Sequence, residues 1–160
     1  MRTTLVQGDD GGVYPVLRSL RGADEPSVVD IWRRAVEATH DFLAAEDIDF
    51  YEGYIRDAYL PALDVTVAEL SGRVVGFIGL HEHRVEMLFV DPEVHKLGIG
   101  TRLLAHAAAQ HATLDLDVNE QNPSALDFYR SRGFVETGRS PTDAEGRPFP
   151  LIHLSGPYPR

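Results

Sequence analysis

The chain has 160 residues, a length that suits one domain with enough residues to bury a core. Apolar residues make up 43% and charged residues 25%, proportions typical of a soluble globular protein and too apolar for a disordered one. The formal net charge of -10 disfavours a nucleic-acid partner, which needs a basic surface. The absence of cysteine excludes disulfides, thiolate metal sites and a cysteine nucleophile.

The first 14 residues are polar and carry a Gly11-Gly12 pair, so we expect a poorly ordered lead-in followed by one domain over residues 15–156. This lead-in lacks the apolar stretch of a signal peptide. The longest apolar run, Val74 to Leu80, is far shorter than the roughly 20 residues of a membrane-spanning helix. We therefore expect a cytoplasmic protein without membrane contact.

The segment that follows the lead-in predicts one strand and two helices. A weak alternation from Tyr14 to Leu20 suggests the strand. Asp24 is a plausible N-cap, and helical spacing of apolar residues continues from there to about Ala38. A second helical pattern covers about Glu46 to Tyr59 and ends at Pro61, with a predicted apolar stripe made of Tyr51, Tyr54, Ile55 and Ala58.

The rest of the chain predicts a meander and then alternating strands and helices. Alternating β-branched residues over 65–70 and a turn at Ser71-Gly72 indicate a hairpin with a second strand over 73–80. A third strand over 84–90 stops at Asp91-Pro92, and a glycine-bearing loop then leads into a helix over 101–109. Later elements are a strand over 113–118, a helix capped by Asn122 and stopped by Gly133, and strands over 134–139 and 149–155. This order indicates an α/β fold with a mixed sheet and helices on both faces.

The loop between Val90 and Thr101 is the most informative segment. A strand ends there, Gly98 and Gly100 follow, and a helix begins, so the unpaired N–H groups of its first turn can attract an anion. Glycine lets a phosphate approach because no Cβ intervenes. A purely structural role for these glycines is an equally open alternative. The loop has no Walker sequence, and its glycine spacing differs from the dinucleotide fingerprint.

Two stretches resemble a known enzyme family. Residues 90–92 (VDP), followed by 95–100 (HKLGIG) and Leu103-Leu104, resemble motif A of the GNAT (Gcn5-related) N-acetyltransferases. Residues 122–129 (NPSALDFY), followed by Gly133-Phe134, resemble the second motif of that family at the expected separation. The resemblance spans about Val16 to Leu154. It implies a GNAT-type mixed, mostly antiparallel central sheet of about seven strands with helices on both faces.

The resemblance also implies a cradle for acetyl-CoA. The pyrophosphate is expected over the backbone amides of 95–101, and the pantetheine arm along 88–90. The residues implied in cofactor binding are Leu88, Phe89, Val90, His95, Lys96, Leu97, Gly98, Ile99, Gly100, Thr101, Asn119, Asn122 and Tyr129. Stretches 38–42 and 119–122 are similar to one bacterial branch of the family, which supplies no secure substrate.

One position departs from the family pattern. His95 stands where the family usually has Arg or Gln, and the basic side chain has moved to Lys96, so we expect a weaker site rather than an absent one. A protein with a net charge of -10 still has to hold a polyanion. We therefore expect a local positive patch of Lys96, Arg102 and Arg130.

The resemblance implies that the hydroxyl of Tyr129 points at the thioester sulfur and assists departure of the thiol. The alternative is a core aromatic residue, the role we assign to Phe128. Two residues are candidates for the base that deprotonates the amine: Glu86, directly or through water, and His40, in a region that shapes the acceptor pocket in this family. The simpler alternatives are an exposed strand carboxylate and a histidine at a helix end. The residues expected to line the acceptor pocket are His40, Asp41, Phe42 and Tyr51.

A metal site is not expected. His81 and His83 lie two residues apart, but no third ligand has a compelling spacing. Asp115 and Asp117 share one strand face, and a polar outer face explains them more simply than acid–base chemistry.

The sequence therefore predicts an N-acetyltransferase that moves an acetyl group directly from acetyl-CoA to an amine in a ternary complex. The acceptor is a small amine, an amino acid or a peptide. The alternative is a CoA- or acyl-CoA-binding sensor without turnover. Acetylation of an aminoacyl-tRNA is disfavoured by the acidic balance. A homodimer is possible, although no sequence feature demonstrates it.

Overall fold

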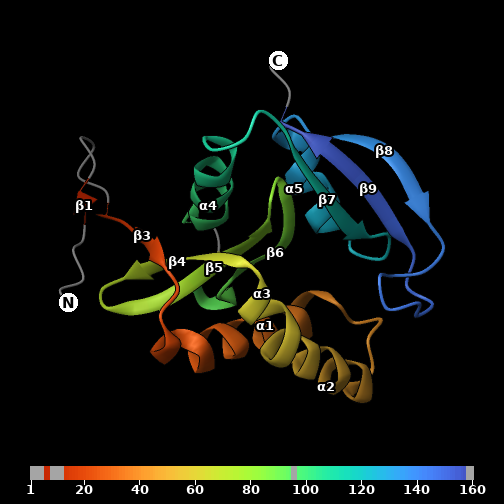
Figure 1. Cartoon of the computed structure of the whole chain (residues 1–160), viewed down its shortest axis with the longest axis horizontal. Helices are drawn as coiled ribbons and strands as arrows, with labels where there is room; N and C mark the ends of the chain where they lie inside the picture. The colour runs from red at the N-terminus through yellow and green to blue at the C-terminus, as the bar shows by residue number, and fades with distance from the viewer. Residues whose placement is uncertain (1–5, 8–12, 95–96, 158–160) are drawn as a thin grey trace.

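The computed structural model describes residues 6–7, 13–94 and 97–157 (Figure 1). Its main sheet has seven strands in the order β3-β4-β5-β6-β7-β9-β8, and every neighbouring pair is antiparallel except β6 and β7, which are parallel. The strands are β3 (Val16–Ser19), β4 (Asp64–Leu70), β5 (Arg73–His81), β6 (Arg84–Val90), β7 (Leu114–Asn119), β8 (Val135–Ser140) and β9 (Leu151–Gly156). The predicted fold class is confirmed.

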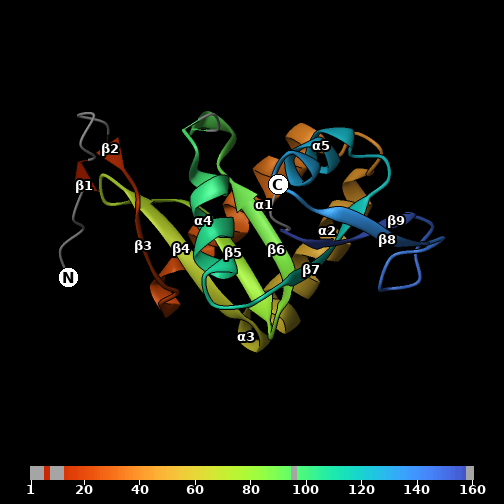
Figure 2. The same ribbon diagram turned by 90° about the horizontal axis from the view of Figure 1, so that it is seen from above.

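Helices cover both faces of this sheet, as predicted. They are α1 (Glu25–Thr39), α2 (Ala45–Tyr54), the short α3 (Leu60–Ala62), α4 (Ile99–Ala108) and α5 (Pro123–Ser131). Figure 1 shows α4 on one side of β5 and β6, with α1 and α2 on the other. Figure 2 shows β8 and β9 at the end of the sheet opposite to β3. No helix in the described part of the chain is long and apolar enough to cross a membrane.

The N-terminal segment contains a short ladder that the sequence did not predict. β1 (Val6–Gln7) pairs antiparallel with β2 (Val13–Tyr14) in a separate two-stranded sheet. Residues 1–5 and 8–12, the rest of the expected lead-in, lie outside the described residues.

Two hydrophobic cores lie on the two faces of the sheet, because side chains alternate along each strand. Phe77 of β5 packs with Trp32 of α1 in one core. The next residue, Ile78, points to the other face and packs with Leu103 of α4, in a core that also contains Tyr129 of α5. The same sheet therefore supports α1 and α2 on one side and α4 and α5 on the other.

The second predicted helix differs from the expected apolar stripe. Residues Ile55–Tyr59 form a π-helical turn (η2) between α2 and α3, and the helical path runs past Pro61 to Ala62. Tyr54 and Ala58 are exposed, and Ala58 lies within the π turn, whose extra residue shifts the helix face. Ile55 is buried as predicted, together with Ile48 and Leu60, which lay outside the predicted stripe. The stripe prediction was therefore wrong at Tyr54 and Ala58.

Strands β6 and β7 separate shortly after they meet. Their parallel ladder pairs Arg84 with Asp115 and Val85 with Leu116, and it extends no further. On its other side, β6 remains paired with β5 as far as Val90. Leu88–Val90 therefore have one backbone edge that β7 does not occupy, and this opening is where the candidate site forms.

The turn before α4 also differs slightly from the prediction. The helix begins at Ile99 rather than Thr101, after Gly98 in a left-handed conformation with φ of 75°. Because side chains rarely adopt that conformation, glycine suits this position. Of the two predicted loop glycines, Gly98 is thus the N-cap of α4 and Gly100 lies inside its first turn.

A buried ion-pair network fixes the end of β6. The side chain of Asp91 has 0% exposure and accepts two hydrogen bonds from Arg34 of α1, at 2.7 and 2.9 Å. It also accepts from Arg73 at 2.5 Å and from the Glu93 backbone at 3.0 Å. The hydrogen bonds from Arg34 make the largest contribution to lowering the pKa of Asp91, which lies far below the usual carboxyl range. The network joins α1, β5 and the start of the loop that leads to α4.

We expect Asp91→Ala to lower the free energy of unfolding by about 2 kcal/mol, because it removes a buried carboxylate that accepts charge-assisted hydrogen bonds from two partly exposed arginines. Urea unfolding measures this loss. Asp30→Ala is the control, since Asp30 pairs with the same Arg34 but its side chain is 62% exposed; it should cost less than about 0.5 kcal/mol. The Asp91 contribution should be complete above pH 3.8 and should shrink as the pH falls further, because the folded carboxyl resists protonation. Equal losses in the two variants would contradict the prediction.

Candidate active site

Two cavities lie beside the free edge of β6, and they meet at His40 and Phe89, which line both. The first, the α4 cavity, has a volume of about 480 Å³ and lies between β6, the start of α4 and α5. The second, the aromatic cavity, has a volume of about 200 Å³ and lies between β6, α1, α2 and the loop that joins β8 to β9. The two cavities are therefore neighbours that share part of their walls.

The α4 cavity is built on the first turn of α4. Its described lining residues are Ala35, Thr39, His40, Leu88, Phe89, Val90, Gly98, Ile99, Gly100, Thr101, Asn122, Ser124, Ala125, Phe128, Tyr129 and Arg132. The first intrahelical donor is Arg102, whose N–H bonds to Gly98 at 3.0 Å. The N–H groups of Ile99, Gly100 and Thr101 precede it, and the positive end of the helix dipole lies with them.

These features fit the phosphates of coenzyme A. N–H groups without an intrahelical partner bind anionic oxygens, and Gly100 presents no side chain to the cavity. The free edge of 88–90 supplies backbone groups along which an extended amide-containing arm can pair. The α4 cavity therefore has an anionic-group site at one end and a strand-like groove along its side.

Arg132, just after the end of α5, brings a cation to this cavity. Its Nε and Nη2 groups donate to Thr101 Oγ1 at 3.0 and 2.5 Å, and Nη1 donates to the Phe128 carbonyl at 3.2 Å. The guanidinium also stacks 3.9 Å from the centre of the Phe128 ring. These contacts hold the charge beside the first turn of α4.

Tyr129 is a buried residue of α5 that lines the α4 cavity. Its ring packs edge-on against Phe128 and Phe134, with centroid separations of 5.1 and 5.5 Å. Burial raises the pKa of its hydroxyl above the usual value, so the group is a neutral donor at physiological pH. Among the described residues, none forms a hydrogen bond with this hydroxyl, which leaves its proton available to a ligand.

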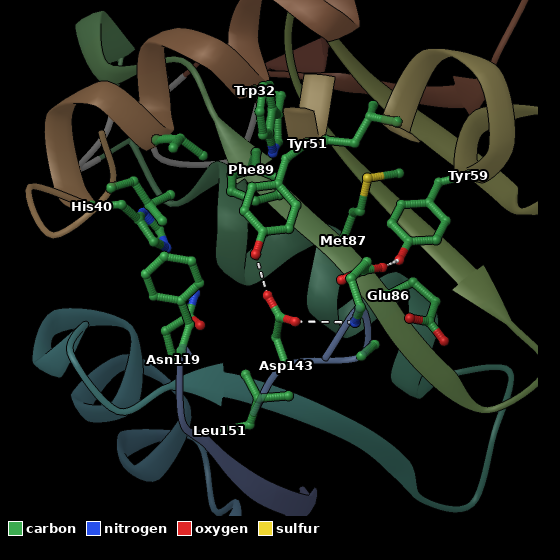
Figure 3. Close-up of a pocket in the computed structure, with 16 residues that line it drawn as sticks. Trp32, His40, Tyr51, Tyr59, Glu86, Met87, Phe89, Asn119, Asp143 and Leu151 are labelled. Carbon is green, nitrogen blue, oxygen red and sulfur yellow. Dashed lines mark hydrogen bonds between the residues drawn. The ribbon is translucent and has the colours of Figure 1, made fainter. Parts of the chain in front are cut away.

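The aromatic cavity combines ring walls with carboxylates (Figure 3). Its described lining residues are Trp32, Val36, His40, Leu43, Tyr51, Ile55, Tyr59, Glu86, Met87, Phe89, Asn119, Asp143, Ala144, Glu145, Phe149 and Leu151. Three acidic side chains, Glu86, Asp143 and Glu145, therefore share a small space with aromatic faces. Such a lining suits a cation with an apolar stem.

Two tyrosines attach the loop between β8 and β9 to the α2 region. The hydroxyl of Tyr51 donates to Asp143, and that of Tyr59 donates to Glu145. Burial first, and the carboxylate partner second, raise the pKa of both phenols well above the ordinary value. Asp143 also accepts from the backbone N–H groups of Glu145 and Arg147, at 3.0 and 2.9 Å, so it shapes the loop as well.

Glu86 comes from β6 and lines the aromatic cavity but not the α4 cavity. Its carboxylate pairs with Nε of Arg84 at 3.0 Å, and Arg84 is held in turn by Asp117 of β7. Figure 3 shows Glu86 on the same side of the cavity as Tyr59. The carboxylate is therefore oriented by an arginine and remains open to the cavity.

His40 follows α1 directly and is 9% exposed. Its Nδ1 lies 2.8 Å from Thr39 Oγ1, and its Nε2 lies 3.5 Å from the side-chain nitrogen of Asn122. Burial lowers the pKa of the imidazole below 6.5, against a smaller opposing effect of Asp41. A neutral imidazole therefore stands where the two cavities meet.

Most residues predicted for the cofactor line the α4 cavity, but not all. Leu97 is 58% exposed and is not among the residues that line either cavity. Asn119 lines the aromatic cavity instead, because it lies at the end of β7 on the face opposite to α5. His95 and Lys96 lie outside the described residues.

The predicted acceptor residues divide in a similar way. His40 and Tyr51 line the aromatic cavity. Asp41 is exposed and does not line it. Phe42 contributes indirectly, because its ring packs 5.2 Å from His40 and 5.8 Å from Phe149.

The expected positive patch has a different composition. The guanidinium of Arg102 stacks 3.6 Å from the centre of the Tyr14 ring, and Arg130 pairs with Glu136 at 3.6 Å. Neither lines the α4 cavity, whereas Arg132 does. The reason is helix phase: Arg132 lies four residues after Phe128 and so shares its face, a spacing that the sequence already contained.

Asp143, Glu145 and Tyr59 were not predicted as site residues. The two carboxylates lie in a loop without a motif, and only the fold brings them to η2. His83, one of the two histidines considered as metal ligands, pairs with Asp115 at 3.0 Å. Among the described residues, no group of three or more His, Asp or Glu side chains is arranged to hold a metal ion.

Residues 31–150 match the family model for the acetyltransferase (GNAT) domain. The chain therefore belongs to the GNAT family of acetyltransferases, and it is an N-acetyltransferase that uses acetyl-CoA.

Two of its relatives are named as lysine acetyltransferases. The chain is 40% identical, over 87% of its length and 95% of the relative's, to the peptidyl-lysine N-acetyltransferase YjaB of Escherichia coli. It is 29% identical, over 74% and 82% of the two lengths, to the peptidyl-lysine N-acetyltransferase YiaC of the same organism. The solution structure of apo-form YjaB from Escherichia coli superposes with a TM-score of 0.82, at 39% identity, covering 88% of this chain and 96% of that one.

Proposed function

We propose that the protein transfers the acetyl group of acetyl-CoA to the ε-amino group of a lysine in a peptide or protein, within a ternary complex. The observation that supports this most strongly is the meeting of the α4 cavity and the aromatic cavity at His40 and Phe89. A donor and an acceptor bound side by side react without a covalent enzyme intermediate, and their proximity lowers the barrier.

The aromatic cavity suits a lysine better than a neutral or acidic acceptor. Glu86, Asp143 and Glu145 attract an ammonium group, while Trp32 and Phe89 offer ring surface to the methylene stem. Its volume of about 200 Å³ fits one side chain rather than a folded domain. The names of YjaB and YiaC give peptidyl-lysine as their acceptor, which agrees with this chemistry.

Acetyl-CoA supplies an activated acetyl group as a thioester. On our proposal, the first turn of α4 and Arg132 hold the phosphates, and backbone N–H groups near Leu88 and Phe89 polarise the acetyl carbonyl. Tyr129 donates a hydrogen bond to the departing sulfur, and Glu86 or His40 receives the proton that the amine must lose.

The test of this function is release of free CoA, followed with a chromogenic thiol reagent, across matched peptides. One peptide contains a lysine and has a blocked N-terminus, a second has norleucine in place of that lysine, and a third has a free N-terminus without lysine. We expect turnover with the first alone. Turnover only with the third would overturn lysine specificity, and acetyl-CoA binding without turnover on any acceptor would support a sensor.

We expect Arg132→Ala to weaken CoA binding about tenfold, because a charge-assisted contact to phosphate is lost. Binding to pantetheine, which lacks the phosphates, should not change. Isothermal titration calorimetry measures both ligands. Arg130→Ala is the matched control, since Arg130 is two residues away and pairs with Glu136 outside the cavity. An equal loss for both ligands, or an equal loss in both variants, would exclude a phosphate role for Arg132.

A further inference from the structure

The backbone at the end of α1 fixes the position of His40. Its N–H donates to the Val36 carbonyl at 2.8 Å, and its own carbonyl accepts from the Leu43 N–H at 3.0 Å. The imidazole is buried and lines both cavities, unlike every acidic side chain of the site. Among the described ionisable residues, His40 is thus the one that lines both cavities.

The neighbours of His40 determine which ring nitrogen carries the proton. The hydroxyl of Thr39 has one proton, and it donates that proton to the Ala35 carbonyl at 2.8 Å. Its oxygen can then only accept at 2.8 Å from His40, so Nδ1 is the protonated nitrogen. Nε2 is left with its lone pair, and its described neighbour is the Asn122 amide, 3.5 Å away. The amide donates to this lone pair, but 3.5 Å is at the long limit of a hydrogen bond, so a substrate proton can displace the contact.

The charged groups around His40 come from several elements. Asp41 lies next to it in the chain, Glu86 of β6 and the loop residues Asp143 and Glu145 line the aromatic cavity, and Arg132 lines the α4 cavity. Tyr51 and Tyr59 bind the two loop carboxylates, and Arg84 binds Glu86. The three carboxylates are therefore paired with these residues, and in the described structure none of the three forms an ion pair with the imidazole of His40.

We propose that His40 is the general base of the transfer, an inference that rests on the function proposed above. The lysine ammonium first gives one proton to water. As the neutral amine nitrogen then forms its bond to the acetyl carbon, the carbon–sulfur bond breaks and its electron pair leaves with sulfur. The proton that nitrogen sheds passes to Nε2 of His40, which becomes an imidazolium, and Tyr129 stabilises the sulfur anion. Thr39 is a positioning residue that sets the tautomer, and Glu86 helps to hold the incoming ammonium.

The state of His40 at neutral pH supports this role. Burial lowers its pKa below 6.5, so the ring is uncharged and able to accept a proton at pH 7. The sign of the linkage follows. The unfolded chain binds the proton more readily, so the contribution of His40 to stability is complete above pH 6.5 and is lost as the pH falls through the folded pKa. Activity that depends on neutral His40 should decline in the same direction.

His40→Gln tests the proposal, because glutamine keeps a polar group near Asn122 but cannot take up a proton. We expect kcat with the lysine peptide to fall about 100-fold while calorimetry gives an unchanged Kd for CoA. The downward bend of kcat/KM below pH 6.5 should disappear in His40→Gln and persist in Glu86→Gln. Thr39→Val should lower kcat without changing KM, and Thr39→Ser should restore it. A bend lost in Glu86→Gln and kept in His40→Gln would overturn the proposal.

A readout without turnover separates this inference from the proposed function. NMR titration of the ¹⁵N-labelled free protein reports the tautomer and the pKa of His40. We expect protonation on Nδ1 and a pKa below 6.5, and protonation on Nε2 at neutral pH would overturn the role of His40. If wild-type protein does not acetylate the lysine peptide, the proposed acceptor fails, whereas active wild type with an equally active His40→Gln variant refutes the base alone.

Discussion

Thr101→Glu is expected to weaken CoA binding at least 100-fold while the protein remains folded. Thr101 is exposed in the first turn of α4, where an acidic residue is favourable for the helix itself. The new carboxylate, however, lies where we propose the phosphates bind, and it can pair with Arg132 and neutralise that charge. Repulsion of about 3 kcal/mol between such close charges corresponds to roughly a 100-fold loss of affinity.

Isothermal titration calorimetry with CoA measures the effect of Thr101→Glu. The control is Ala105→Glu, which adds the same charge to an exposed position on the same helix outside the α4 cavity. Its Kd should remain within threefold of wild type, and circular dichroism should give the native helix signal for both variants. Equal Kd values for the two variants would mean that phosphates do not bind at the start of α4.

Tyr129→Phe is expected to lower kcat by at least tenfold, and by about 100-fold if the hydroxyl acts with the usual strength of such a donor. A thiol has a pKa of about 8.5, and burial raises the pKa of Tyr129 above its usual value of about 10. Complete proton transfer to the thiolate is therefore unfavourable. The hydroxyl acts as a hydrogen-bond donor to the charge that develops on sulfur.

The same variant should leave binding and stability nearly unchanged. Because no described residue forms a hydrogen bond with the Tyr129 hydroxyl, removing this group leaves no described donor or acceptor without its partner in the folded state. The Kd for CoA and the midpoint of thermal unfolding should match wild type. Tyr54→Phe serves as the control, since Tyr54 is exposed and lines neither cavity. A kcat for Tyr129→Phe within threefold of the control would remove Tyr129 from the mechanism.

Local chemistry in the sequence predicted the helix starts and the strand that border the α4 cavity well. Gly98 fits a left-handed cap, and Asn122 with Pro123 starts α5, because each residue type satisfies a backbone need at a helix end. The strand predicted over 84–90, with its stop at Asp91-Pro92, matches β6 to the residue. Such features depend on neighbours within a few positions in the chain, so they can be predicted without knowledge of the fold.

The aromatic cavity depends on contacts between distant segments. Tyr59 and Glu145 are 86 residues apart, and their hydrogen bond follows from the placement of a loop against η2. The π turn at Ile55–Tyr59 was also missed, because one added residue changes which side chains face the core without changing composition. Periodicity therefore predicted a helix here, but not which of its faces is buried.

The most direct test of the account is a comparison of backbone amide spectra of the ¹⁵N-labelled protein with and without CoA. The account requires CoA to bind along the α4 cavity. It predicts the largest shift changes at Gly98, Ile99, Gly100 and Thr101, with a second group at 88–90 and smaller changes along α2. If millimolar CoA leaves the amide resonances of 98–101 unshifted, or shifts only resonances elsewhere, the result would contradict it.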